Sequence, residues 1–123
     1  MEKGLKLEEL KVYCVAVEIG ELVWNIVLTW NPFAKHTLGK QFVEAADSIS
    51  FNIAEGYGRF HYKENKNFCY FSRGSAKETS SAVEKAKARL LISHQEYEQL
   101  KEKLELYFRL MFGYINSIGP KKG

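Results

Sequence analysis

The sequence predicts an all-α protein, an antiparallel up-and-down four-helix bundle that forms a single domain over residues 1–123. Three observations support this prediction. Apolar residues recur at intervals of three and four in four segments, without the alternation typical of strands. Both prolines, Pro32 and Pro120, fall where a helical pattern ends. A chain of 123 residues is long enough to bury a core but short for two domains.

Helical periodicity and capping residues predict where each helix begins and ends. We expect helices over residues 7–30, 38–57, 62–91 and 94–118, with a loose tail over residues 119–123. Thr37 is the expected N-cap of the second helix. Ser93 and Glu96 have the spacing of a capping box at the start of the fourth helix.

The chain is organised around the two helices within residues 38–91. The second helix is expected to bury Leu38, Phe42, Ala45, Ile49, Ile53 and Gly56. The third helix is expected to bury Phe68, Phe71, Ser72, Ser75, Thr79, Ala82, Ala86 and Leu90. Between them, Gly56 and Gly58 are expected to end the helix and let the backbone reverse, with a positive φ at Gly56.

The first helix has two apolar faces, which predicts an oligomer. One face carries Leu10, Tyr13, Cys14, Val17, Trp24 and Leu28, and the opposite face carries Val12, Val15, Ile19, Val23, Ile26 and Trp30. Two apolar faces need two burial partners, one of which is the core and the other most simply a neighbouring subunit. The fourth helix has a side stripe of Leu106, Leu110 and Tyr114, and Phe51 points away from the core, so both could add to such a contact.

Positive charge is concentrated in the third helix and in the turn before it. Residues 57–91 carry eight cationic and three anionic side chains, a local net charge of +5, whereas residues 1–56 carry −3. The candidate nucleic-acid-binding residues are Arg59, Lys63, Lys66, Tyr70, Arg73, Lys77 and Lys87. Cations spaced along a helix suit phosphates, and tyrosines suit unpaired bases. The alternative interpretation is a solvated helix face.

The sequence gives little sign of other chemistry. We predict no metal site, no cofactor and no catalytic residues, because the three histidines are scattered and no phosphate-binding glycine loop is present. Cys14 and Cys69 are isolated and no secretory signal or membrane-spanning stretch is apparent, which predicts a cytoplasmic protein. Arg89 and His94 match the spacing found in HEPN ribonucleases, but both positions have structural explanations at helix ends.

A motif in the centre of the chain resembles a known family. Its residues are Ala46, Ser48 and Ile49, then Asn52, Ile53, Ala54, Glu55, Gly56, Tyr57, Gly58 and Arg59, followed by Lys63, Glu64, Phe68, Gly74 and Ser75. This pattern resembles the 23S rRNA intervening-sequence proteins, a bacterial four-helix-bundle family that is similar to the accessory protein of diversity-generating retroelements. The resemblance implies a cytoplasmic homopentamer, since that accessory protein forms a pentameric barrel that binds nucleic acid and a reverse transcriptase.

We give the motif residues structural roles. Asn52 is expected to make an inter-helix hydrogen bond, Glu55 a contact with the turn, and Gly56 to supply backbone freedom. The leading functional hypothesis is a non-enzymatic oligomer that binds nucleic acid, most simply RNA, through the basic face of the third helix. One alternative is an adaptor ring that binds a protein partner such as a reverse transcriptase. The remote alternative is an HEPN-type ribonuclease.

Overall fold

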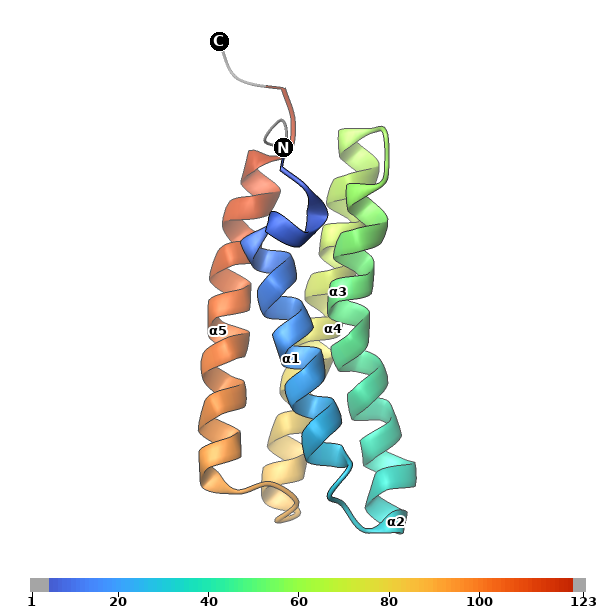
Figure 1. Ribbon diagram of the computed structural model, residues 1–123, viewed down its shortest axis with the longest axis vertical. Coiled ribbons are helices and arrows are strands. Elements are labelled where there is room, and N and C mark those ends of the chain that lie inside the picture. The colour runs from blue at the N-terminus through green and yellow to red at the C-terminus, as the bar shows by residue number, and fades with distance from the viewer. Residues whose placement is uncertain (1–4, 121–123) are drawn as a thin grey trace.

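The computed structural model describes residues 5–120, which form a helical bundle and contain no strand. Its four long helices are α1 (Lys11–Val27), α3 (Lys40–Tyr57), α4 (Tyr62–Ala88) and α5 (His94–Ser117). Figure 1 shows them side by side, the chain passing down along α1, up along α3, down along α4 and up along α5. The predicted all-helical bundle is confirmed. The predicted loose tail falls partly outside the described residues, which end at Pro120.

The predicted helix over residues 7–30 is divided and ends earlier. A short 3-10 helix, η1 (Leu7–Glu9), comes first, and the extended backbone of Leu10 (φ −73°, ψ 118°) separates it from α1. One predicted apolar face of α1 packs in the core through Val12, Val15, Ile19, Val23 and Ile26. The other predicted face leaves Trp24 and Leu28 exposed to solvent.

The second predicted helix begins six residues earlier than expected, so the assignment of Thr37 as its N-cap is wrong. Asn31 caps the helix instead, because its side chain accepts a hydrogen bond of 2.9 Å from the backbone N–H of Ala34. Pro32 occupies the first helical position, where its missing N–H costs nothing. α2 (Pro32–Ala34) leads into a π-helical turn, η2 (Lys35–Gly39), and then into α3.

The glycine turn between α3 and α4 works differently from the prediction. Gly56 lies inside α3, and Gly119 is the one described glycine with positive φ, so positive φ at Gly56 is wrong. A Cβ at Gly56 would lie 2.7 Å from Oδ1 of Asn65 and 2.8 Å from Cβ of Phe68, both on α4. Glycine is therefore needed because two helices approach closely there, and not because the backbone reverses.

The buried face of α4 contains fewer large side chains than the sequence predicts. Small and polar residues pack there without solvent exposure, namely Cys69, Ser72, Ala76, Thr79, Val83 and Ala86. Phe71 and Leu90 were predicted in this face, but their side chains are 57% and 90% exposed. Phe71 packs edge-on against Phe68 at the rim of the α3–α4 contact, where the close approach of the helices leaves no room inside.

A buried polar contact joins three helices at the centre of the bundle. The Ser72 hydroxyl of α4 donates to the backbone oxygen of Ile49 in α3 at 2.8 Å. Because a serine hydroxyl has one hydrogen, the Tyr107 hydroxyl of α5 donates to Ser72 Oγ across 2.6 Å. Tyr107 is fully buried, and burial raises the pKa of its hydroxyl. All three polar groups are thereby paired.

The connection between α4 and α5 follows two known capping patterns. The backbone N–H groups of Leu90 and Leu91 donate to the oxygens of Lys87 and Ala86, a Schellman motif that places Leu90 at a φ of 59°. The predicted capping box at the start of α5 is confirmed, since Ser93 and Glu96 exchange hydrogen bonds of 2.9 and 3.0 Å. Two well-formed helix ends thus fix this tight connection.

Candidate nucleic-acid interface

The exposed side of α4 carries the predicted basic residues. The 27 residues of this helix bury small side chains toward α3 and α5, so positions on the opposite side face solvent. Lys63, Arg73, Lys77 and Lys87 are exposed there, and Lys66 is half-buried. We call Lys63, Lys66, Arg73 and Lys77 the basic stripe. Two of them, Lys63 and Lys66, lie in the first two turns of α4, and the other two lie near its middle.

The basic stripe lacks compensating carboxylates. Within residues 5–120, none of its four cations forms an ion pair, and neither does Lys87. Arg59 differs from them, because its guanidinium lies 3.1 Å from Glu55 and 3.7 Å from Glu64 and also covers the ring of Phe68. The charge of Arg59 is thus partly neutralised, whereas the charge of the stripe remains available to an anion.

Three aromatic rings lie against cations of α4, one from α4 itself and two from α5. The guanidinium of Arg73 lies 5.0 Å from the ring centroid of Tyr70. The ammonium of Lys77 lies 4.5 Å from the ring centroid of Phe108, and that of Lys87 lies 3.7 Å from the ring centroid of Tyr97. These contacts hold long, flexible side chains along the face that α4 and α5 share.

The motif residues hold α3 against α4. Gly56 permits the close approach, Ile53 is fully buried, and Gly58 caps the C-terminus of α3 with a helical φ of −77°. Glu55 contacts the turn through Arg59, as predicted. Ala54 is half-buried beside them, and with Gly58 and Glu55 it lines a shallow surface depression.

The hydrogen bonds of Asn52 stay within α3, so the predicted inter-helix bond is wrong. Its side-chain amide donates to the backbone oxygen of Ser48 at 2.9 Å and to Ser48 Oγ at 3.0 Å. Ser48 links the two helices instead, because the Ser75 hydroxyl of α4 donates to Ser48 Oγ at 2.9 Å. Asn52 therefore orients the serine that makes the contact.

Comparison with protein families shows the family to which this chain belongs. A family model described as 23S rRNA-intervening sequence protein matches residues 8–113. The chain belongs to this family. A crystal structure of a protein of unknown function from the S23 ribosomal protein family of Bacteroides thetaiotaomicron has the same fold, with a TM-score of 0.77, at 19% sequence identity. The alignment covers 86% of this chain and 99% of that one. A search of curated proteins gives no match.

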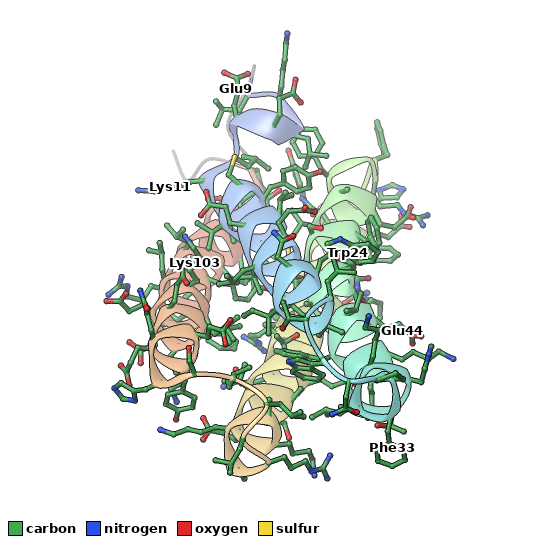
Figure 2. The ribbon with its side chains drawn as sticks, turned by 60° about the horizontal axis from the view of Figure 1, so that its bottom comes forward. Glu9, Lys11, Trp24, Phe33, Glu44 and Lys103 are labelled. Atoms are coloured by element: carbon green, nitrogen blue, oxygen red, sulfur yellow. The ribbon has the colours of Figure 1, made fainter. Side chains whose placement is uncertain are left out.

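This member of the 23S rRNA intervening-sequence family has an acidic side as well as a basic one. Asp47 of α3 lies near Glu21 of α1, and Figure 2 shows Glu44, one turn before Asp47, at the outer side of α3. Partial burial, and then the nearby charge of Glu21, raise the pKa of Asp47. Trp24 lies on the side of α1 nearest α3, while Lys103 on α5 pairs with Glu18 at 2.8 Å on the other side.

The remaining candidate residues lie at the far end of the bundle. Arg89 ends α4 and His94 begins α5, where the His94 side chain is 78% exposed and its Nε2 lies 3.9 Å from Glu98. Across residues 5–120, no group of three or more histidine, cysteine or acidic residues is placed to hold a metal ion. No helix of the same range is long and apolar enough to cross a membrane.

Proposed function

We propose that this chain is a non-enzymatic, oligomeric helical protein that binds RNA through the basic stripe of α4. The observation that carries the proposal is the run of cations without carboxylate partners on an exposed face. An unpaired surface cation attracts phosphate and releases condensed counterions when the nucleic acid binds. Lys63 and Lys77 are fourteen residues apart on one helix, a separation of about 21 Å, or roughly six nucleotides of one strand.

Salt-dependent binding tests this proposal. Fluorescence anisotropy with a labelled RNA should show affinity falling steeply as salt rises. The variant Lys66→Glu/Arg73→Glu/Lys77→Glu should bind weakly, and the slope of log K against log salt should be shallower by about 2 because three phosphate contacts are lost. Binding that is absent at low salt, or unchanged in this variant, would refute the proposal.

A control variant with the same change in net charge keeps this test specific. Lys6, Lys11 and Lys40 are exposed and lie outside α4, so Lys6→Glu/Lys11→Glu/Lys40→Glu should retain most of the affinity. Arg59→Gln should have a smaller effect than any single change in the stripe, because two carboxylates already neutralise Arg59. If both triple variants lose binding equally, total charge and not the stripe governs affinity.

We further propose that the up-and-down antiparallel bundle assembles as a cytoplasmic homopentamer. Family membership and the exposed apolar residues Trp24, Leu28 and Phe51 support an assembly, and the free thiols of Cys14 and Cys69 support a reducing location. Light scattering after size exclusion should give five times the chain mass of 14.2 kDa. A monomer at micromolar concentration would contradict the assembly.

A second candidate function is an adaptor ring that binds a protein partner, such as a reverse transcriptase. The same exposed Trp24 and Phe51 favour it, since exposed aromatic side chains on α1 and α3 suit contacts with a protein partner. Under this alternative, Trp24→Ser/Phe51→Ser would abolish partner binding and leave RNA affinity unchanged. The two functions are therefore separable by variants on different faces of the bundle.

The ribonuclease alternative is left to a direct assay. Arg89 and His94 occupy helix ends, and the exposed His94 lies nearest the carboxylate of Glu98, which supports a structural explanation of the pair. We propose that purified protein leaves a labelled RNA intact during prolonged incubation. Cleavage that disappears in both His94→Ala and Arg89→Ala would establish a nuclease instead.

A further inference from the structure

We infer that the RNA bound by this protein is single-stranded, with its bases stacked on Phe112 of α5 and Tyr70 of α4. This inference rests on the proposed function and names the form of nucleic acid that the site takes. It also extends the site from one helix to the face shared by two. Phe112 lies outside the basic stripe in sequence, and four further observations place it in the interface.

The first observation is the register between α4 and α5. Lys87 lies over Tyr97, and Lys77 lies over Phe108, so contacts move down α4 as they move up α5. One more helical turn from Lys77 leads to Arg73, and one more turn from Phe108 leads to Phe112. Arg73 and Phe112 are therefore at the same level of the bundle.

The second observation is the exposure of the Phe112 ring. Its side chain is 70% exposed in the last two turns of α5, and within the described chain it makes no ring–ring or cation–π contact. Phe108, one turn away, is half-buried and covered by Lys77. An exposed phenyl ring at the level of Arg73 is an apolar surface that bundle packing does not explain.

The third observation is the stacked pair beside it. Arg73 lies 5.0 Å from the Tyr70 ring centroid, while Tyr70 itself remains 44% exposed. Arg73 thus holds its charge against the exposed ring of Tyr70 on α4, at the same level of the bundle as Phe112 on α5. An arrangement of rings for bases and cations for phosphates is the way proteins bind single strands, and each stacked base contributes substantially.

The fourth observation is chemical and distinguishes a single strand from a duplex. In a duplex the faces of the bases are covered by their neighbours in the stack, so a protruding phenyl ring would meet only sugars and phosphates. Unpaired bases offer free faces to Phe112 and Tyr70, and their phosphates can then lie near Lys66, Arg73 and Lys77. Only a single strand therefore offers base faces to the aromatic side chains and phosphates to the cationic side chains at the same time.

Paired binding assays test the inference. Anisotropy is measured with an unstructured single-stranded RNA and with a duplex RNA of equal length, for wild type and Phe112→Ala. We expect wild type to prefer the single strand, and Phe112→Ala to weaken that binding by between about 5-fold and 150-fold without changing the salt slope. Phe33→Ala is the matched control, since Phe33 is 79% exposed and points outward at the α2 end.

A spectroscopic variant gives an independent readout. Phe112→Trp should keep the affinity, and single-stranded RNA should quench its emission more than that of wild type, which retains Trp24 and Trp30. Tyr70→Ala should reproduce the loss if Phe112→Ala proves unstable. Circular dichroism and mass measurements show whether each variant remains folded and assembled.

The possible outcomes distinguish a failure of the single-strand inference from a failure of the proposed RNA binding. Equal affinity for the two RNAs together with no effect of Phe112→Ala would overturn the single-strand inference but leave salt-dependent RNA binding intact. A lower oligomer mass for Phe112→Ala would also overturn it, because the ring would then lie in a subunit contact. No binding of either RNA at low salt would overturn the proposed function itself.

Discussion

Replacing Gly56 with alanine should destabilise the protein by about 1–2 kcal/mol. The new methyl group would lie 2.8 Å from Cβ of Phe68 and 3.0 Å from the backbone oxygen of Asn65, atoms that cannot move without shifting α4. Overpacking of this kind costs about 1–3 kcal/mol, and the better helix propensity of alanine returns up to about 1 kcal/mol. At this chain length, the net loss corresponds to a fall in Tm of roughly 4–8 °C.

Gly74 offers a matched control on the facing helix. It also lies within a long helix, but an added Cβ there would meet no atom within 4 Å. Gly74→Ala should therefore stabilise the protein by about 0.5–1 kcal/mol through helix propensity alone. Thermal and urea unfolding followed by circular dichroism, at one protein concentration, measure both variants. Equal stability of the two variants would show that close helix approach is not the reason for Gly56.

Three further variants probe capping, buried polarity and pH. Leu90→Gly should stabilise the protein by about 1 kcal/mol in the same unfolding assay, because Leu90 has a φ of 59° and an exposed side chain; a loss of stability would contradict the capping argument. Ser72→Ala should cost about 1–3 kcal/mol, more than Tyr107→Phe, since it leaves the Tyr107 hydroxyl buried without a partner. Burial raises the pKa of the Cys69 thiol from 9.0 to about 11, so unfolding releases a proton and stability should fall as pH rises from 9 to 11. That fall should be smaller in Cys69→Ala, and equal slopes would exclude the thiol as its source.

Helical periodicity predicted most of the buried residues of α3 correctly. The apolar stripe of η2 and α3, from Leu38 through Phe42 and Ile49 to Ile53, is buried as predicted. The same reasoning misplaced Phe71, because hydrophobicity does not reveal how closely α3 and α4 approach. Helix separation depends on side chains from both helices, so it is a property of the pair and not of either sequence segment.

Local signals near helix ends were decisive where several residues agreed and misleading where one stood alone. Ser93 and Glu96 cap each other, which makes the start of α5 predictable. Thr37 had only its residue type in its favour, and the combination of Asn31 and Pro32 begins the helix instead. The end of α4 at a leucine with positive φ contradicts residue preference and was not predictable.

The basic residues of the candidate site were predictable, but the aromatic residues of α5 were not. Lys63 and Lys77 recur at helical spacing within one segment, so their common face follows from the sequence. Phe112 joins them only through the register of α4 against α5, which the contact between Lys77 and Phe108 establishes. Helix register is tertiary information, and no pattern within residues 94–118 contains it.

The π-helical turn at Lys35–Gly39 allows one residue to be added or removed at this point without interrupting the helix. A π turn holds about one residue more than an α-helical turn, so it accommodates an extra residue without ending the helix. Deletion of one residue there should restore regular helix and rotate the Asn31 cap by roughly 100° while leaving α3 beyond Lys40 in place. Natural variation in length and engineered insertions should thus be tolerated here better than anywhere along α3 itself.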